Sequence, residues 1–174
     1  MKILGIDPGL QATGYGLIDV SAGPQPSIAL REVGTIEPVS RQALPQRLDG
    51  VYRHLSDIIR QTAPHVLVLE KLYSHYRHPT TACLLGHVRG VIILCAARQN
   101  VPIVEHSVKR IRQALTGNGN ASKQQVRAYV AHQLQFKADR LTLDASDALA
   151  LALGFMRMES KNHLSRELKS FISK

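Results

Sequence analysis

Acidic residues are scarce in this chain. Only 13 Asp and Glu residues stand against 22 Lys and Arg residues, which leaves a net charge of +9 at pH 7. A strongly basic protein favours an anionic partner, either nucleic acid or a membrane surface, although high charge also serves plain solubility. The composition therefore points toward a polyanion without choosing one.

Cysteine is scarcer still, with only Cys83 and Cys95. They are far apart and form no C-x-x-C pair, so the pattern supports neither a disulfide framework nor a zinc site. Both fall in an apolar stretch, where we expect buried free thiols. No signal peptide precedes the first apolar run, and no run approaches the roughly 18 residues of a membrane span. We therefore expect a cytoplasmic protein with reduced thiols.

The length of 174 residues predicts a single domain, with a folded part at 1–158 and a basic tail at 159–174 that is either frayed helix or disordered. Apolar runs bounded by turn residues predict five strands, at 2–7, 12–19, 27–38, 65–70 and 102–106. Helical periodicity predicts helices at 41–62, 80–99, 107–116, 122–134 and 143–158. This order predicts an α/β fold, a five-stranded mixed sheet with helices on both faces.

Four of the few acids stand at the ends of apolar runs: Asp7, Glu70, Asp144 and Asp147. Each alone has an ordinary explanation as a turn former, a strand-end carboxylate or a helix cap. Ligand sites of α/β sheets lie at the carboxyl ends of strands, and two acids three residues apart share one helix face. Gathered in one place, these carboxylates would repel one another unless cations neutralised them.

Carboxylate oxygens are hard ligands that suit Mg²⁺ or Mn²⁺. Two such ions held close together can clamp a phosphodiester and activate water against it, without a His or Ser nucleophile. We therefore predict that the four acids form a catalytic site with two Mg²⁺ ions, for which Mn²⁺ can substitute. A basic chain with such a site would be a metal-dependent nuclease.

Several motifs together resemble the RuvC family of crossover junction endodeoxyribonucleases. They are G-I-D-P-G with T-G-Y-G, V-L-V-L-E followed by Tyr73, G-N-G-N-A-S-K-Q-Q-V, and D-A-S-D-A-L-A-L-A. The resemblance covers about residues 1–158. It implies a ribonuclease H-like fold, a homodimer, and metal-dependent resolution of Holliday junctions by paired symmetric nicks in DNA recombination and repair. It also implies cooperation with the RuvA–RuvB branch-migration complex.

The resemblance further implies roles for single residues. The family's catalytic acids fall on Asp7, Glu70, Asp144 and Asp147, although some members carry His at the position of Asp144. Its aromatic residue falls on Tyr73, and its basic residues fall on Arg112 and Lys123. Family members have Lys where this chain has Arg112, and the two side chains differ in hydration and geometry.

Basic residues flank the turn 117–120, and we expect Arg110, Arg112 and Lys123 to bind DNA phosphates there. The ordinary alternative is a solvated helix face. Tyr73 would stack on an unpaired base, which contributes about 1–3 kcal/mol, or else be a core residue with its hydroxyl at the rim. Arg89 is a further candidate for the DNA-binding surface.

The helix predicted at 80–99 is apolar around much of its circumference. It is either an internal core helix or the interface of a C₂ dimer, which would present two identical sites to a two-fold symmetric junction. The sequence pattern leaves both possibilities open, and the family resemblance favours the dimer.

Three other functions compete with this interpretation. The segment D-P-G-L-Q-A-T-G-Y-G resembles the first phosphate loop of the actin and hexokinase fold, which needs two such domains and about twice this length. A related ribonuclease H-like nuclease would act on RNA or on DNA without a junction. A non-enzymatic architectural protein would bind DNA through its basic surface alone.

Overall fold

The computed structural model describes residues 1–21, 27–71, 79–136 and 141–172. Its strands are β1 (Lys2–Asp7), β2 (Thr13–Val20), β3 (Ile28–Ile36), β4 (Val66–Glu70) and β5 (Ile103–His106). Its helices are α1 (Leu44–Thr62), α2 (Pro79–Arg98), α3 (Val108–Thr116), α4 (Lys123–Gln133) and α5 (Leu143–Ile172). The predicted elements are thus present, with boundaries that shift by a few residues except at the end of α5.

The five strands form one mixed sheet in the order β3-β2-β1-β4-β5. β1 pairs antiparallel with β2, and the parallel pairs β1–β4 and β4–β5 make the other half. The register sets Ile6 beside Leu69, so the next residues, Asp7 and Glu70, leave the sheet as neighbours at the same edge. The five-stranded mixed sheet predicted from the sequence is confirmed.

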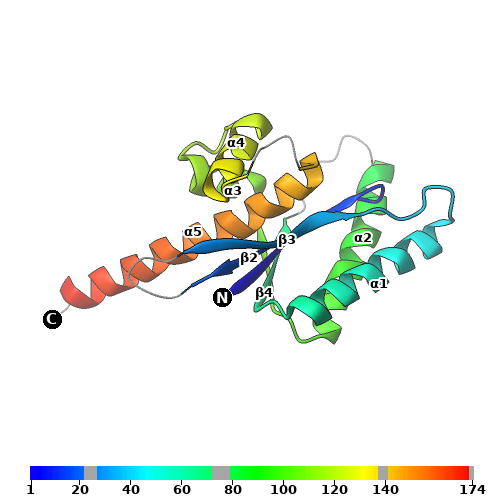
Figure 1. Ribbon diagram of the computed structural model, residues 1–174, viewed down its shortest axis with the longest axis horizontal. Coiled ribbons are helices and arrows are strands. Elements are labelled where there is room, and N and C mark those ends of the chain that lie inside the picture. The colour runs from blue at the N-terminus through cyan, green and yellow to red at the C-terminus, as the bar shows by residue number, and fades with distance from the viewer. Residues whose placement is uncertain (22–26, 72–78, 137–140, 173–174) are drawn as a thin grey trace.

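Helices cover both faces of this sheet (Figure 1). On one face, Leu4, Ile6 and Leu67 pack with buried residues of α1 and α2. On the other face, Ile3 and Val68 pack with residues of α3, α4 and α5. Consecutive residues of β1 and β4 therefore point into different cores, which explains why both strands are apolar without alternation.

Three glycines let α5 lie directly on the sheet. A Cβ atom built on Gly5 would stand 2.0 Å from the carbonyl oxygen of Ala148, and one on Gly14 would stand 2.1 Å from that of Asp144. On Gly16 it would meet the side chain of Leu149 at 2.6 Å. The first glycine of G-I-D-P-G and both glycines of T-G-Y-G thus allow close helix packing, which brings the start of α5 up to the end of β1.

α5 extends the prediction at its far end. The core helix was expected over 143–158, but the helix continues without interruption to Ile172. Helical backbone therefore runs through residues 159–172, most of the segment assigned to the basic tail. Of the two alternatives predicted for the tail, helix or disorder, the structure shows helix for residues 159–172.

α2 differs from the sequence expectation in two ways. By length and composition, Thr80–Arg98 could cross a membrane, with a mean hydropathy of 1.6, although no apolar run was expected to reach that length. Val88, Ile92 and Cys95 on one side of it are fully buried in the core beside α1, as in a core helix of a globular protein. Cys83 was expected to be buried but is exposed, because the first turns of α2 bury much less surface than its C-terminal half.

Candidate active site

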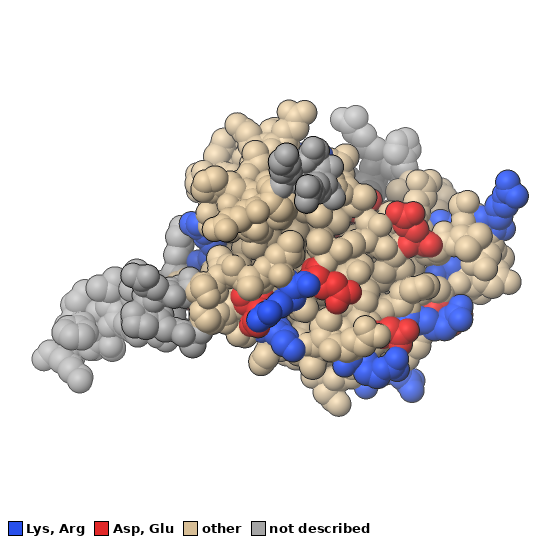
Figure 2. All heavy atoms as spheres, viewed as in Figure 1, with Lys and Arg blue, Asp and Glu red and all other residues tan. Residues whose placement is uncertain are grey.

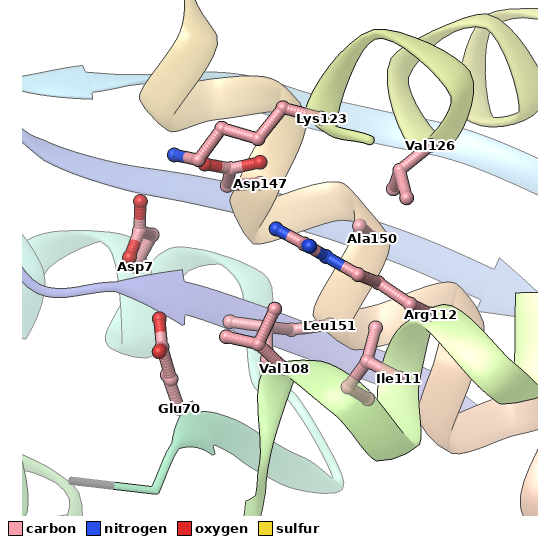
Figure 3. Close-up of a pocket in the computed structure, with 10 residues that line it drawn as sticks. All are labelled: Asp7, Glu70, Val108, Ile111, Arg112, Lys123, Val126, Asp147, Ala150 and Leu151. Carbon is pink, nitrogen blue, oxygen red and sulfur yellow. The ribbon is translucent and has the colours of Figure 1, made fainter. Parts of the chain in front are cut away.

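A pocket of about 140 Å³ opens where β1, β4 and α5 meet α3 and α4 (Figure 3). Asp7, Glu70 and Asp147 line one side of it. Arg112 points toward these acids from across the pocket, and the amine of Lys123 lies beside Asp147 (Figure 3). The remaining lining is apolar and consists of Val108, Ile111, Val126, Ala150 and Leu151.

Three of the four predicted acids thus come together from elements far apart in the sequence. Asp7 ends β1, Glu70 ends β4, and Asp147 lies in the first turns of α5. Asp144 lies one turn earlier, with its backbone against Gly14, and is not among the residues that line the pocket. Its charge still acts on Asp7 and raises the pKa of that carboxyl.

Burial and mutual repulsion both act on the carboxylates of the pocket. Burial, with smaller contributions from the charges of Asp147 and Glu70, raises the pKa of Asp7 from 3.8 to about 7. Burial and the charge of Asp147 also raise the pKa of Glu70, although Lys123, Arg89 and Arg112 oppose this shift. A bound cation would favour the charged form of these carboxylates against both their burial and their mutual repulsion.

The donor set fits a hard divalent cation, because it offers carboxylate oxygens and no thiol or imidazole. Among the described residues, no three Asp, Glu, His or Cys side chains are close enough to form a complete metal site as they stand. The Nζ of Lys123 lies 2.6 Å from Oδ2 of Asp147 and supplies positive charge there instead. The carboxylates that would hold a metal ion are Asp7, Glu70 and Asp147, with Asp144 beside them.

Lys123 owes its place to the connection between α3 and α4. It is the first residue of α4, where a cation opposes the helix dipole, and its ion pair with Asp147 offsets that penalty. In the turn 117–120, the side-chain amide of Gln113 donates to the Gly117 carbonyl and accepts from the Gly119 N–H. Ser122 then caps α4 through a capping box with Gln125.

The other DNA-binding candidates have different positions. Arg110 is exposed on α3 and does not line the pocket. Tyr73 lies outside the described residues. Arg89 is not a surface cation as expected, because its side chain is only 7% exposed and forms an ion pair with Glu105. The sequence feature that could have predicted its burial is that Arg89 is a single charged residue inside an otherwise apolar stretch of helix.

The raised pKa of Asp7 predicts an unusual pH dependence for the metal-free protein. Because this pKa is higher in the folded protein than in the unfolded chain, the folded state binds the proton more tightly. The stability that this contributes is complete below about pH 4 and is lost as pH rises through about 7. We expect urea unfolding in EDTA to show this loss in the wild type and not in Asp7→Asn. Parallel pH profiles of the two proteins would contradict it.

The chain is similar to known proteins over most of its length. Residues 3–155 match the family model described as crossover junction endodeoxyribonuclease RuvC. The RuvC of Rhodopirellula baltica is 41% identical over 151 residues, which cover 87% of this chain and 83% of that protein.

Two solved structures share the fold. The Thermus thermophilus RuvC structure matches with a TM-score of 0.84 at 23% identity and covers 93% of this chain and 97% of that one. The same protein in complex with a Holliday junction substrate matches with a TM-score of 0.82 at 21% identity, over 92% and 96% of the two chains. With the family model matching most of its length, this chain belongs to the RuvC family of crossover junction endodeoxyribonucleases.

Proposed function

We propose that this protein resolves Holliday junctions by paired symmetric nicks, through metal-dependent hydrolysis at Asp7, Glu70, Asp144 and Asp147. The observation that carries the proposal is the pocket in which Asp7, Glu70 and Asp147 face Arg112 and Lys123. Metal-dependent cleavage of DNA needs acidic side chains that hold the metal ions and basic side chains that hold the phosphate. Membership of an endodeoxyribonuclease family supports the same reaction.

Each side of the pocket has its own part in the reaction. When bound, two Mg²⁺ ions, or Mn²⁺ in their place, would activate water and neutralise the charge that develops on the phosphodiester. Asp7 lies between the strand that carries Glu70 and the helix that carries Asp147, and all three carboxylates hold the cations. Arg112 orients the scissile phosphate from across the pocket and Lys123 does so from beside Asp147, while Arg110 and Tyr73 also contact the DNA.

The convergence of acids and basic side chains in one pocket favours an enzyme over an architectural protein. On the face shown in Figure 2, Lys and Arg side chains occupy several separate positions with acids between them, and they form no continuous basic stripe. The pocket is where charges of both signs converge. The substrate proposed is a four-way junction, since the Thermus thermophilus RuvC was solved with one. We place the protein in the cytoplasm, working with the RuvA–RuvB complex in recombination and repair.

We also propose that the protein is a homodimer that pairs through α2. One side of this helix is buried in the core, but Ile93 is 39% and Leu94 is 53% exposed on the other side. Gly86 and Gly90 are also exposed, with nothing within 4 Å of a Cβ built on either, so a second helix can approach closely. Such a C₂ interface would set two sites on the two strands of a junction.

This interface predicts that Leu94→Glu shifts the protein from dimer to monomer, because the charge would be buried at the contact. Sedimentation velocity at micromolar concentration measures the change. Val39→Glu is the matched control, since Val39 is 59% exposed at a site remote from α2 in the chain and should leave the mass unchanged. A wild type that sediments as a monomer and keeps full activity would refute the dimer.

The function is tested on a synthetic mobile junction incubated with Mg²⁺ or Mn²⁺, with both nicks mapped. We expect symmetric nicks with ligatable 5′-phosphate ends, and far slower cutting of linear duplex DNA and of RNA. Equal cutting of linear duplex would indicate a general nuclease. Junction binding without cutting under either ion would favour the architectural alternative.

A further inference from the structure

Arg89 is the charged residue most deeply buried in the described part of the chain. It lies in the middle of α2, and its side chain is 7% exposed. A buried guanidinium is retained only where its donors are paired, since leaving it unpaired costs several kcal/mol. The partners of Arg89 therefore indicate what it does.

Both partners lie at strand ends beside the candidate site. One terminal nitrogen of Arg89 donates to the carbonyl oxygen of Glu70, and the other donates to Oε1 of Glu105 on β5. Arg89 also lines a small hollow together with Asp7, Pro8 and Glu70. The guanidinium thus joins the ends of β4 and β5 behind the acids.

The sheet leaves the Glu70 carbonyl without a backbone donor. The N–H of Lys71 donates to His106 on β5, so the backbone groups of Glu70, one residue earlier, face β1. The register Ile6 to Leu69 makes residue 8 the next donor along β1. Residue 8 is Pro8, which has no N–H, and Arg89 supplies the missing hydrogen bond.

We infer that Arg89 is a positioning residue that fixes the end of β4 and so aims the Glu70 carboxylate at the metal ions. The inference rests on the proposed function, in which Glu70 is a ligand. Arg89 does not line the pocket that holds the acids, and we infer that it acts through the backbone of Glu70. Glu105 holds the guanidinium in place, so it supports the same geometry from β5.

The test is Mn²⁺ binding to the full-length, metal-free protein, measured by electron paramagnetic resonance. Arg89→Met keeps the length and apolar packing of the side chain but removes both donors. We expect its Mn²⁺ affinity to fall by about tenfold or more, as when an outer partner of a metal ligand is lost. On the junction, the Mn²⁺ concentration for half-maximal cleavage should rise by about the same factor, while the rate at saturating Mn²⁺ should change far less.

Pro8→Ala provides a rescue that a purely structural role would not allow. In the Arg89→Met background, it restores an N–H opposite the Glu70 carbonyl, and we expect part of the lost Mn²⁺ affinity to return. Arg98→Met, an exposed arginine on the same helix, is the matched control and should bind Mn²⁺ like the wild type. Glu105→Gln should weaken Mn²⁺ binding in the same direction, and it decides the question if Arg89→Met does not fold.

Unchanged Mn²⁺ affinity in Arg89→Met, or in Glu105→Gln where the first variant is unfolded, would overturn the inference. If Arg89→Met loses Mn²⁺ affinity and adding Pro8→Ala restores none of it, then Arg89 does not act through its hydrogen bond to the Glu70 carbonyl. Failure of the proposed function looks different, because Glu70→Gln itself would then bind Mn²⁺ and cut junctions like the wild type.

Discussion

Asp7→Asn is expected to abolish junction cleavage while making the metal-free protein more stable. Burial and the neighbouring acids raise the pKa of Asp7 to about 7. At neutral pH the negative charge of Asp7 therefore opposes folding. Asparagine keeps the shape and removes the charge. A metal ligand supplies several kcal/mol of transition-state stabilisation, so its loss should slow cleavage by at least about a thousandfold.

Two measurements separate the effects in Asp7→Asn. Single-turnover cleavage in Mg²⁺ gives the loss of rate, and urea unfolding in EDTA at pH 8 gives the gain in stability. Junction binding without metal should be retained, because Arg112 and Lys123 are unchanged. Increased stability together with wild-type cleavage would remove Asp7 from the metal site.

Asp19→Asn is the matched control on the neighbouring strand. Asp19 pairs with Arg31, which lowers the pKa of its carboxyl, so its charge favours the folded state. The same substitution should therefore slightly weaken the fold and leave cleavage intact. A gain of stability in Asp7→Asn and a loss in Asp19→Asn would show that a negative charge destabilises the fold in the acidic pocket and not at every acidic residue.

Gly14→Ala should lower both stability and activity, because it forces the start of α5 away from the sheet. The new Cβ would stand 2.1 Å from the Asp144 carbonyl oxygen and 2.9 Å from the Ala145 nitrogen. These are backbone atoms, so no side-chain rotation can relieve the clash. Overpacking of this kind costs about 1–3 kcal/mol, and a shift of about 1 Å at a catalytic group can slow a reaction about a hundredfold.

The comparison for Gly14→Ala is Gly50→Ala in α1. A Cβ on Gly50 has only Pro38 nearby, at 3.9 Å, so there alanine should stabilise the helix by about 0.5–1 kcal/mol and leave cleavage unchanged. Urea unfolding and single-turnover cleavage are measured on both variants. A Gly14→Ala protein with wild-type cleavage would show that the distance between α5 and β1 does not set the site.

Patterns local in the chain were the ones that the sequence could predict. The apolar runs that end at Asp7 and Glu70 are strands, as the turn and polar residues that bound them indicated. In the structure these two strands are neighbours in one sheet. The i,i+3 spacing of Asp144 and Asp147 placed both in the first turns of α5, but only Asp147 lines the pocket. Helix spacing sets a common side, whereas the crossing of α5 over β1 decides which of the two acids reaches Asp7.

Residues whose environment comes from distant elements were the ones misjudged. Arg89 was a candidate for the DNA-binding surface, yet its side chain is buried and donates hydrogen bonds to Glu70 and Glu105. Cys83 was expected in the core, yet it lies on the less buried part of α2. In both cases the helix was predicted correctly, and its rotation against the sheet, which depends on contacts with α1 and β4, decided the outcome.

The amino-acid sequence by itself determined the order of strands and helices and the four acids at their ends, because apolar periodicity and turn residues act over a few positions. The tertiary structure alone decided that three of those acids share a pocket with Lys123, and that a buried arginine supplies the hydrogen bond Pro8 cannot give. Those arrangements join residues 19 to 140 positions apart, from Arg89 with Glu70 to Asp7 with Asp147, and only the packing of α2 and α5 on opposite faces of the sheet brings them within reach.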